Sequence, residues 1–265
     1  MEKSSNAVLI AVPSAGRAGR WTEFVTSLPG LFPSARCVAF VPEEEVDEYV
    51  AALRGTGWYV EPDNGGIAET RFHVMGRAWE YKAQLVHFFD DDLHVVKGKP
   101  EWWLPIGWAH VIAGEWGAAG LGGEAWATDD RPDWEIKRPA MNYAISVREY
   151  FRGKARFNDV QWAEDWHVIL SLNERGMPTY FSNRCTVRER KRPAGTGAEA
   201  GGCFRQRTPE NLLESARDFV RLHPEFSKIV PKPGARYQNT DGAEFALTAR
   251  WVAAFRRSAQ ERLDL

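Results

Sequence analysis

The stretch His87-Phe88-Phe89-Asp90-Asp91-Asp92-Leu93 is the strongest indication of how this chain folds. It joins the apolar run Leu85–Phe89 to three consecutive aspartates. A continuous apolar run of this length predicts a strand that is buried on both faces. Three adjacent carboxylates repel one another, so the cluster predicts a bound cation, although a solvated acidic turn would have the same sequence.

The segments before this stretch alternate between predicted strands and predicted helices. We expect strands at 7–12, 37–41, 58–60 and 85–89, and helices at 21–28, 42–53 and 67–81. This order predicts an α/β fold with a mostly parallel central sheet flanked by helices. Ligands of such sheets lie at the carboxyl ends of the strands, so we expect Pro13–Arg20 and Asp90–Asp92 to face a ligand.

The second half of the chain is less regular. Helices are predicted at 99–114, 160–175, 208–222 and 242–263, and a strand at 141–147. Residues 117–123 are Gly-rich, and residues 184–207 are polar, basic and Gly-rich and predict a loop. The chain has no internal repeat or linker that would divide it. We therefore expect a single domain over 1–265, with C-terminal helices.

Composition excludes several classes of protein. The 34 Lys and Arg against 36 Asp and Glu give a net charge of −2, so contact with nucleic acid would require a local basic patch. Cys37, Cys185 and Cys203 form no CxxC motif, which argues against a disulfide framework or a structural zinc. The longest uncharged run, Trp102–Gly114, is too short to span a membrane, and no signal-peptide pattern occurs. We expect a cytoplasmic protein without a membrane partner.

The aspartate cluster has the chemistry of a site for a hard divalent cation. Alternate side chains of an extended segment share a face, so Asp90 and Asp92 are expected to point to the same side. Two carboxylates suit Mn²⁺ or Mg²⁺, which would keep coordination positions for the phosphates of a ligand.

A second acidic motif, Val160-Gln161-Trp162-Ala163-Glu164-Asp165-Trp166-His167, opens a predicted helix. The helix dipole keeps carboxylates in the first turn ionised. A positioned carboxylate that removes the proton of a hydroxyl group contributes about 10²–10⁴-fold to a reaction. We predict Asp165 as a general base and Glu164 as the residue that orients it, although helix starts favour acidic residues without any catalytic role. His167 is a weaker candidate, as a metal ligand.

The predicted loop concentrates positive charge. Its seven cations are Arg184, Arg188, Arg190, Lys191, Arg192, Arg205 and Arg207. Gly201 and Gly202 beside Cys203 would let backbone amides approach a phosphate closely. The loop could clamp a diphosphate or contact nucleic-acid phosphates, or it could be a solvated loop.

Two tryptophans of the predicted helix at 99–114 offer a stacking surface. Trp102 and Trp103 could stack on a base, or they could belong to the core.

Taken in chain order, these motifs resemble those of the GT-A-fold glycosyltransferases. The strand with its three aspartates resembles the family's DxD element, and Glu164-Asp165 resembles the ED motif of inverting members. Val12-Pro13-Ser14 with Arg17 resembles the loop over the nucleotide, and Glu69-Thr70-Arg71 resembles the helix whose arginine lies near it. The resemblance implies a GT-A-like domain, with about 1–95 as the nucleotide-sugar half and about 96–265 on the acceptor side.

The same resemblance assigns roles to individual residues. It implies that Asp90 and Asp92 hold Mn²⁺ or Mg²⁺ and that Asp165 and Glu164 are catalytic. A UDP-sugar would be bound by the donor-side residues Pro13, Ser14, Arg17, Arg71, Asp90, Asp91, Gly201 and Gly202.

A narrower resemblance concerns the acceptor. The ED helix followed by Gly201-Gly202-Cys203 between basic residues resembles the phage-type DNA glycosyltransferases, including the TET-associated group. It implies transfer of a hexose or N-acetylhexosamine to 5-hydroxymethylcytosine or 5-hydroxymethyluracil in DNA, in a phage-infected or prophage-bearing bacterial cell. The implied acceptor residues are Trp102, Trp103, Arg188, Arg190, Lys191, Arg192, Cys203 and Arg205. A third metal ligand is expected from His223 or from a side chain near Asn183–Cys185.

Other interpretations stay open at this stage. The acceptor could be a protein, a lipid or a saccharide. A metal-dependent phosphatase would place its nucleophilic aspartate after the first strand rather than the fourth, and a nuclease usually scatters its carboxylates more widely. A non-catalytic nucleic-acid-binding module would leave both acidic motifs unexplained. The oligomeric state and the stereochemical outcome are not indicated.

Overall fold

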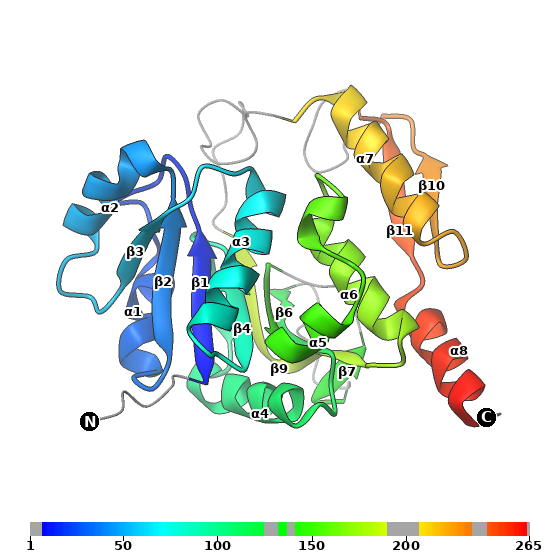
Figure 1. Cartoon of the computed structure of the whole chain (residues 1–265), viewed down its shortest axis with the longest axis horizontal. Coiled ribbons are helices and arrows are strands. Elements are labelled where there is room, and N and C mark those ends of the chain that lie inside the picture. Colours follow the sequence, from blue (N-terminus) through cyan, green and yellow to red (C-terminus); the bar gives the residue numbers. More distant parts are fainter. Residues whose placement is uncertain (1–6, 125–131, 137–140, 190–206, 235–242, 264–265) are drawn as a thin grey trace.

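A computed structural model describes residues 7–124, 132–136, 141–189, 207–234 and 243–263 of the protein. These residues form a nine-stranded mixed sheet covered by helices and a separate two-stranded sheet (Figure 1). Within the described part of the chain, none of the helices has the length and apolar character needed to cross a membrane.

The first half of the chain confirms the predicted alternation of strands and helices. The parallel strands are β1 (Val8–Pro13), β2 (Arg36–Val41), β3 (Tyr59–Pro62) and β4 (Leu85–Phe89), in the order β3-β2-β1-β4. They are connected by α1 (Glu23–Leu31), by the short helix η1 (Glu43–Glu45) with α2 (Val46–Ala52), and by α3 (Ile67–Glu80). Because β1 pairs with β4, the loop after Pro13 lies beside Asp90–Asp92.

The other half of the large sheet is mixed. Beyond β4 the order is β8 (Asn142–Ser146), β6 (Ala118–Gly123), β9 (Thr179–Glu189) and β5 (Leu93–Lys97), and β7 (Trp134–Ile136) also pairs with β9. The predicted loop at 184–207 is wrong at its start, because β9 pairs with β6 and β5 and continues to Glu189. The Gly-rich stretch is itself a strand. A Cβ on Gly120 would lie 2.5 Å from the Asn142 carbonyl oxygen, so glycine here allows close strand packing.

The remaining elements are the helices of the second half of the chain and the two strands of the small sheet. They are α4 (Pro100–Ala113), α5 (Val147–Arg152), the short helix η3 (Phe157–Asp159), α6 (Glu164–Glu174), α7 (Pro209–Leu222), β10 (Ser227–Pro231), β11 (Phe245–Ala249) and α8 (Trp251–Leu263). The predicted helix at 242–263 is wrong in its first part. Phe245 and Leu247 are buried and alternate with more exposed residues, which is the period of a strand rather than a helix.

Helix α6 begins four residues later than predicted. Ala163 adopts a left-handed conformation with a φ of 71°, which prevents the helix from extending toward Val160. The preceding Trp162 is held by Ser215 of α7: its N–H donates to Ser215 Oγ at 2.9 Å, and Ser215 Oγ donates to its carbonyl at 2.7 Å. Both acidic residues therefore lie in the first turn of α6.

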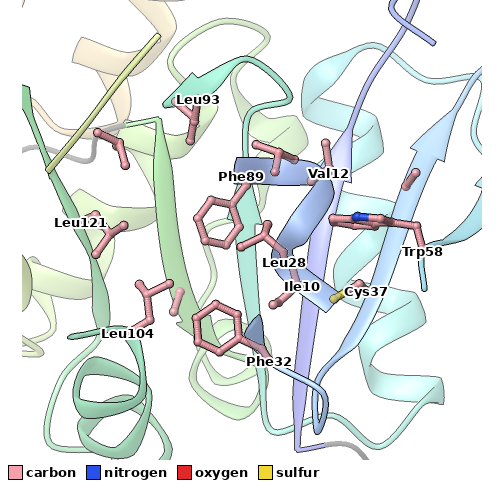
Figure 2. Close-up of a cluster of buried hydrophobic side chains, with 14 of the residues drawn as sticks. Ile10, Val12, Leu28, Phe32, Cys37, Trp58, Phe89, Leu93, Leu104 and Leu121 are labelled. Carbon is pink, nitrogen blue, oxygen red and sulfur yellow. The ribbon is translucent and has the colours of Figure 1, made fainter. Parts of the chain in front are cut away.

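Side chains of β1 belong to apolar clusters on both faces of the sheet, as the continuous apolar run predicts. Ile10 and Val12 pack with α1 and α4, through residues such as Leu28 and Leu104. Figure 2 shows Leu28 beside Ile10 and Phe89 in this cluster. Leu9 and its neighbour Ala11 belong to the opposite cluster, which includes residues of α3, α5 and α6. The aspartates follow β4, which is anchored in the same way, with Phe89 in the first cluster and Phe88 in the opposite one.

A third apolar cluster joins the C-terminal elements to the outer face of α6. It includes Leu170 of α6, Leu212 and Phe219 of α7, and Phe245 and Leu247 of β11. Figure 1 shows α6, α7, β11 and α8 grouped at one end of the sheet. Helix α6 therefore lies between the sheet and the C-terminal elements.

We predict that Ile10→Ala lowers the free energy of unfolding by about 2–5 kcal/mol, because it removes a fully buried side chain and leaves a cavity. Urea-induced unfolding measures this change. Val50→Ala is the control: Val50 is 46% exposed, so its change should stay within about 0.5 kcal/mol. Equal effects of the two substitutions would contradict the assignment of β1 to the core.

Candidate functional site

The loop after β1 and the aspartates after β4 meet through Ser14. Ser14 Oγ donates a hydrogen bond to Asp91. It accepts from Tyr49 Oη at 2.7 Å and from Trp21 Nε1 at 3.1 Å. Tyr49 Oη also accepts from the backbone N–H of Arg17 at 3.1 Å. The predicted donor-side residues Ser14, Arg17 and Asp91 are therefore brought together around a buried hydroxyl group.

Asp91 is an internal anchor. Its side chain is 4% exposed, and its carboxylate accepts from Ser14 and from Arg17 Nη1, the latter at 2.5 Å. The Thr22 N–H donates to the Asp91 carbonyl at 3.3 Å, and Thr22 is the N-cap of α1. Asp91 thus ties the strand end to the loop and to α1, which limits what it can offer a ligand.

Asp90 and Asp92 remain partly accessible on either side of this anchor. Their side chains are 34% and 13% exposed. Asp90 lies 3.5 Å from Arg71 Nη2, and Asp92 lies 3.5 Å from Arg17 Nη1. Burial raises the pKa of Asp90 well above its usual range; Arg71 opposes this, while nearby carboxylates, Asp92 and Glu189 among them, add to it. A bound cation would relieve this repulsion.

These two carboxylates suit a hard divalent ion as part of its ligand set. Within the residues that the structure describes, no three His, Cys, Asp or Glu side chains gather closely enough to hold a metal ion. Asp90 and Asp92 could therefore supply two oxygen ligands, and the oxygens of a bound ligand and of water would complete the shell. Mg²⁺ and Mn²⁺ accept this kind of site, in which few ligands come from the protein.

Arg71 connects the aspartates to the second acidic motif. Its guanidinium is buried between Glu164, to which Nη1 donates, and Asp90. It also lies over the rings of Phe88 and Tyr143, at 5.9 and 5.6 Å from their centroids. Arg71 is 7% exposed. It therefore acts as an internal link between the end of β4 and α6, and its place near a nucleotide, which the resemblance implies, stays a prediction.

The two acids of α6 differ in accessibility. Glu164 is 4% exposed and paired with Arg71, whereas Asp165 is half-buried and accepts from the Trp166 N–H at 2.9 Å. Burial raises the pKa of Glu164 to about 7 and also raises the pKa of Asp165, while Arg71 opposes both changes. Asp165 is thus the more accessible acid, and the pair of Glu164 with Arg71 holds the first turn of α6 that carries both.

Three aromatic residues of this region were not predicted from the sequence. Tyr49 and Trp21 complete the hydrogen bonds of Ser14, and Tyr143 packs beside Arg71. The Tyr143 hydroxyl is buried without a partner among the described residues. Tyr49 lies in an ordinary amphipathic helix and Tyr143 in an apolar strand, so no sequence signal distinguished them from core residues.

The predicted acceptor residues are not all brought to this site. Helix α4 lies along the end of the sheet opposite the tip of β1 (Figure 1). Its Trp102 is 63% exposed beneath the Lys99 ammonium, and its Trp103 packs near Trp134. Arg188, near the end of β9, pairs with Glu124 at 3.3 Å. The next residue, Glu189, contributes to the raised pKa of Asp90. Of the described candidates, Arg188 is on the strand that pairs with β5, which directly follows the aspartates.

Several predicted residues lie outside the described part of the chain: Arg190, Lys191, Arg192, Gly201, Gly202, Cys203 and Arg205. The expected third metal ligand is not found among the side chains proposed for it. His223 bonds to His167 and Glu174, Asn183 donates to the Pro132 carbonyl at 2.7 Å, and Cys185 is buried in the core.

Comparison with known proteins shows the fold. No protein-family model matches the chain, and no curated protein matches it. The solved structure of GalNAc-T7 with UDP, GalNAc and Mn²⁺ is similar at 13% identity and a TM-score of 0.52, over 83% of this chain and 48% of that one. A structure of S. aureus TarS 1–349 is similar at 12% identity and a TM-score of 0.54, over 82% of this chain and 65% of that one. A second structure of TarS 1–349, in complex with UDP, is similar at 10% identity and a TM-score of 0.52, over 97% of this chain and 72% of that one. The chain thus has the GT-A-type fold, and it spans about half of the GalNAc-T7 chain.

We predict that Arg71→Met destabilises the protein by about 3–5 kcal/mol above pH 7, where Glu164 is ionised, because it leaves this carboxylate buried without its partner. The double substitution Arg71→Met with Glu164→Met should recover most of this loss, because a buried pair can be replaced by apolar side chains. Urea unfolding of both variants tests the expectation. Arg221→Met, which breaks an exposed pair with Asp218, should cost less than about 1 kcal/mol. Additive losses in the double variant would contradict the pairing.

The raised pKa of Glu164 predicts a pH dependence of stability. The folded chain keeps this proton up to about pH 7, whereas an unfolded Glu releases it near 4.5. The free energy of unfolding should therefore fall as the pH rises from about 4.5 to about 7. Glu164→Gln should reduce this slope in urea unfolding without divalent ions. If the free energy of unfolding had the same dependence on pH in the wild type and in Glu164→Gln, Glu164 would not titrate in this range.

Proposed function

We propose that the protein is a metal-dependent glycosyltransferase that moves a sugar from a UDP-sugar to a hydroxyl group. The proposal rests on one arrangement: Arg71 links Asp90, one of the two carboxylates expected to hold the cation, to Glu164 in the first turn of α6. The GT-A-type fold supports this interpretation, because ligands of open α/β sheets lie beyond the carboxyl ends of the strands. A phosphatase or nuclease would not require a second acidic centre on α6.

On the donor side, the chain offers carboxylates and a loop held in place by buried hydrogen bonds. Asp90 and Asp92 would hold Mn²⁺ or Mg²⁺, which when bound offsets the charge of a diphosphate. Arg17, fixed by Asp91 and by the backbone contact with Tyr49, borders the same side. Pro13 and Ser14 would contact the nucleotide through their backbone carbonyl groups, since the Ser14 hydroxyl is already bonded and the Ser14 N–H donates to the Phe40 carbonyl.

On the acceptor side, Asp165 would take the proton of the acceptor hydroxyl group. The acceptor oxygen then forms a bond to the anomeric carbon of the sugar, and the bond from that carbon to the UDP phosphate oxygen breaks. The departing UDP carries the electron pair of the broken bond. Attack from the face opposite to UDP would invert the configuration. Glu164, paired with Arg71, orients the first turn of α6.

For the acceptor, we propose the hydroxymethyl group of 5-hydroxymethylcytosine or 5-hydroxymethyluracil in DNA. Support comes from the sequence motifs and from the basic residues of β9, where Arg184 and Arg188 precede the cations at 190–207. The modified base would have to leave the stack to reach Asp165. This acceptor implies an enzyme in the cytoplasm of a phage-infected or prophage-bearing bacterial cell.

Mass spectrometry of the product tests donor and acceptor together. The protein is incubated with Mn²⁺, pooled UDP-sugars and an oligonucleotide containing either hydroxymethylated base, with unmodified DNA as control. A gain of one hexose or N-acetylhexosamine on the modified strand alone supports the full proposal. Release of UDP that requires Mn²⁺, without product on DNA, would redirect the search to a protein, lipid or saccharide acceptor. Absence of both UDP release and UDP binding would overturn the proposed activity.

We predict that Asp90→Asn and Asp92→Asn weaken Mn²⁺ binding, measured by isothermal titration calorimetry, because each removes a charged oxygen ligand. Asp165→Asn should instead keep Mn²⁺ and UDP binding and slow transfer by about 10²–10⁴-fold, because it removes the base. Asp218→Asn, an exposed carboxylate on α7, is the matched control and should change neither. Unchanged Mn²⁺ affinity in both Asn variants would overturn the metal assignment.

A further inference from the structure

Two buried histidines join the acidic helix α6 to the end of α7. His167, on the first turns of α6, is 3% exposed, and His223, the C-cap of α7, is 2% exposed. Their rings lie 5.0 Å apart between centroids. Neither residue belongs to the site proposed above, although His167 follows Asp165 by two residues.

A line of three hydrogen bonds runs through this pair. Asp159 Oδ2 lies 3.1 Å from His167 Nε2, His167 Nδ1 lies 2.8 Å from His223 Nε2, and His223 Nδ1 lies 2.9 Å from Glu174 Oε2. Carboxylates terminate the line at both ends. All four imidazole nitrogens are therefore engaged.

A count of hydrogens shows that two neutral imidazoles cannot satisfy this line. Each of the three contacts needs one hydrogen, and ionised carboxylates supply none. Two neutral imidazoles supply two hydrogens in total. If His167 donates from Nε2 to Asp159, its Nδ1 accepts, and His223 must then donate from both nitrogens. One proton beyond the neutral state completes the line.

We propose that His167 and His223 together hold one extra proton between Asp159 and Glu174, and that this proton fastens helix α6 to the C-terminal end of α7. His223 is the doubly protonated ring and His167 the neutral one. Burial, with His223 adding to its effect, lowers the pKa of His167 to about 4, which agrees with a neutral His167. His167 and His223 are thus positioning residues for the first turn of α6, which carries Asp165. Any effect of the pair on sugar transfer rests on the proposed function.

The surrounding charges allow this arrangement. Glu174 borders a hollow that is lined also by Glu225, by Arg257 and by Glu261 of α8. Arg257 pairs with both Glu225 and Glu261, so this cation is directed to those two carboxylates. From α7, the side chain that packs on His223 is the uncharged ring of Phe219, at 4.8 Å. The line thus runs between Asp159 on one side and Glu174 on the other.

Glu174→Gln offers a test that keeps the shape of the side chain. A Gln amide can donate to His223 Nδ1, so the line would then be complete with two neutral imidazoles. The variant should fold, and its histidine pair should lose the need for the extra proton. Glu261→Gln is the matched control, since Glu261 lines the same hollow and lies outside the hydrogen-bonded line.

Long-range ¹H–¹⁵N NMR of the histidine rings in the metal-free protein reads out the protonation states directly. At pH 6 to 7 we expect His167 to be neutral with its hydrogen on Nε2, and His223 to carry hydrogens on both nitrogens. In Glu174→Gln both rings should be neutral, and Glu261→Gln should match the wild type. Two neutral rings in the wild type, or identical spectra for wild type and Glu174→Gln, would overturn the proposal.

Urea unfolding from pH 6 to 8.5 supplies a second readout. While the folded wild type keeps the extra proton at pH values where unfolded histidine, with a pKa of about 6.5, releases it, the unfolding constant should rise by up to about tenfold per pH unit relative to Glu174→Gln. An unfolding constant that has the same dependence on pH in the wild type and in Glu174→Gln would also overturn the proposal. Neither measurement needs a substrate, so the proposed transfer could fail while the shared proton is observed, and the reverse outcome is equally distinguishable.

Discussion

The pairing of the buried Arg71 guanidinium with Glu164 and Asp90 is the interaction on which the two acidic motifs depend. It lies between Glu164 of α6 and Asp90 at the end of β4, over the rings of Phe88 and Tyr143. A buried carboxylate without a partner is strongly unfavourable, so Glu164 and Arg71 hold each other in place. The position of α6 relative to the sheet, and with it the position of Asp165, follows from this pair.

The aspartate cluster shows how three identical neighbours acquire different roles. Asp91 points inward and uses its carboxylate on Ser14 and Arg17, which fastens the loop after β1. Asp90 and Asp92 stay partly exposed. The inward anchor therefore holds the outer two in a crowded arrangement, whose repulsion a cation would relieve. The same segment can thus be both a structural fastening and a ligand site.

Helix α6 is held from its other side by the C-terminal elements. Ser215 of α7 bonds to both backbone groups of Trp162, just before the helix begins. The third apolar cluster and the His167–His223 pair act between the same elements. The elements after residue 207 therefore pack on α6 and fix where its first turn starts.

From the sequence alone, we could predict the parallel half of the sheet, the two acidic motifs and the sheet edge at which both the loop after β1 and the aspartates lie. These features depend on local patterns: continuous apolar runs, the order of strands and helices, and acids directly after a strand or at a helix start. The roles of Arg71, Tyr49, Tyr143 and His223 could not be predicted, because each depends on a partner between 35 and 93 residues away, such as Tyr49 for Ser14 and Glu164 for Arg71. Strands β9 and β11 likewise emerged only from pairing, since sheet hydrogen bonds join segments distant in sequence. Tertiary packing thus decided which polar residues are buried as links and which remain available to a ligand.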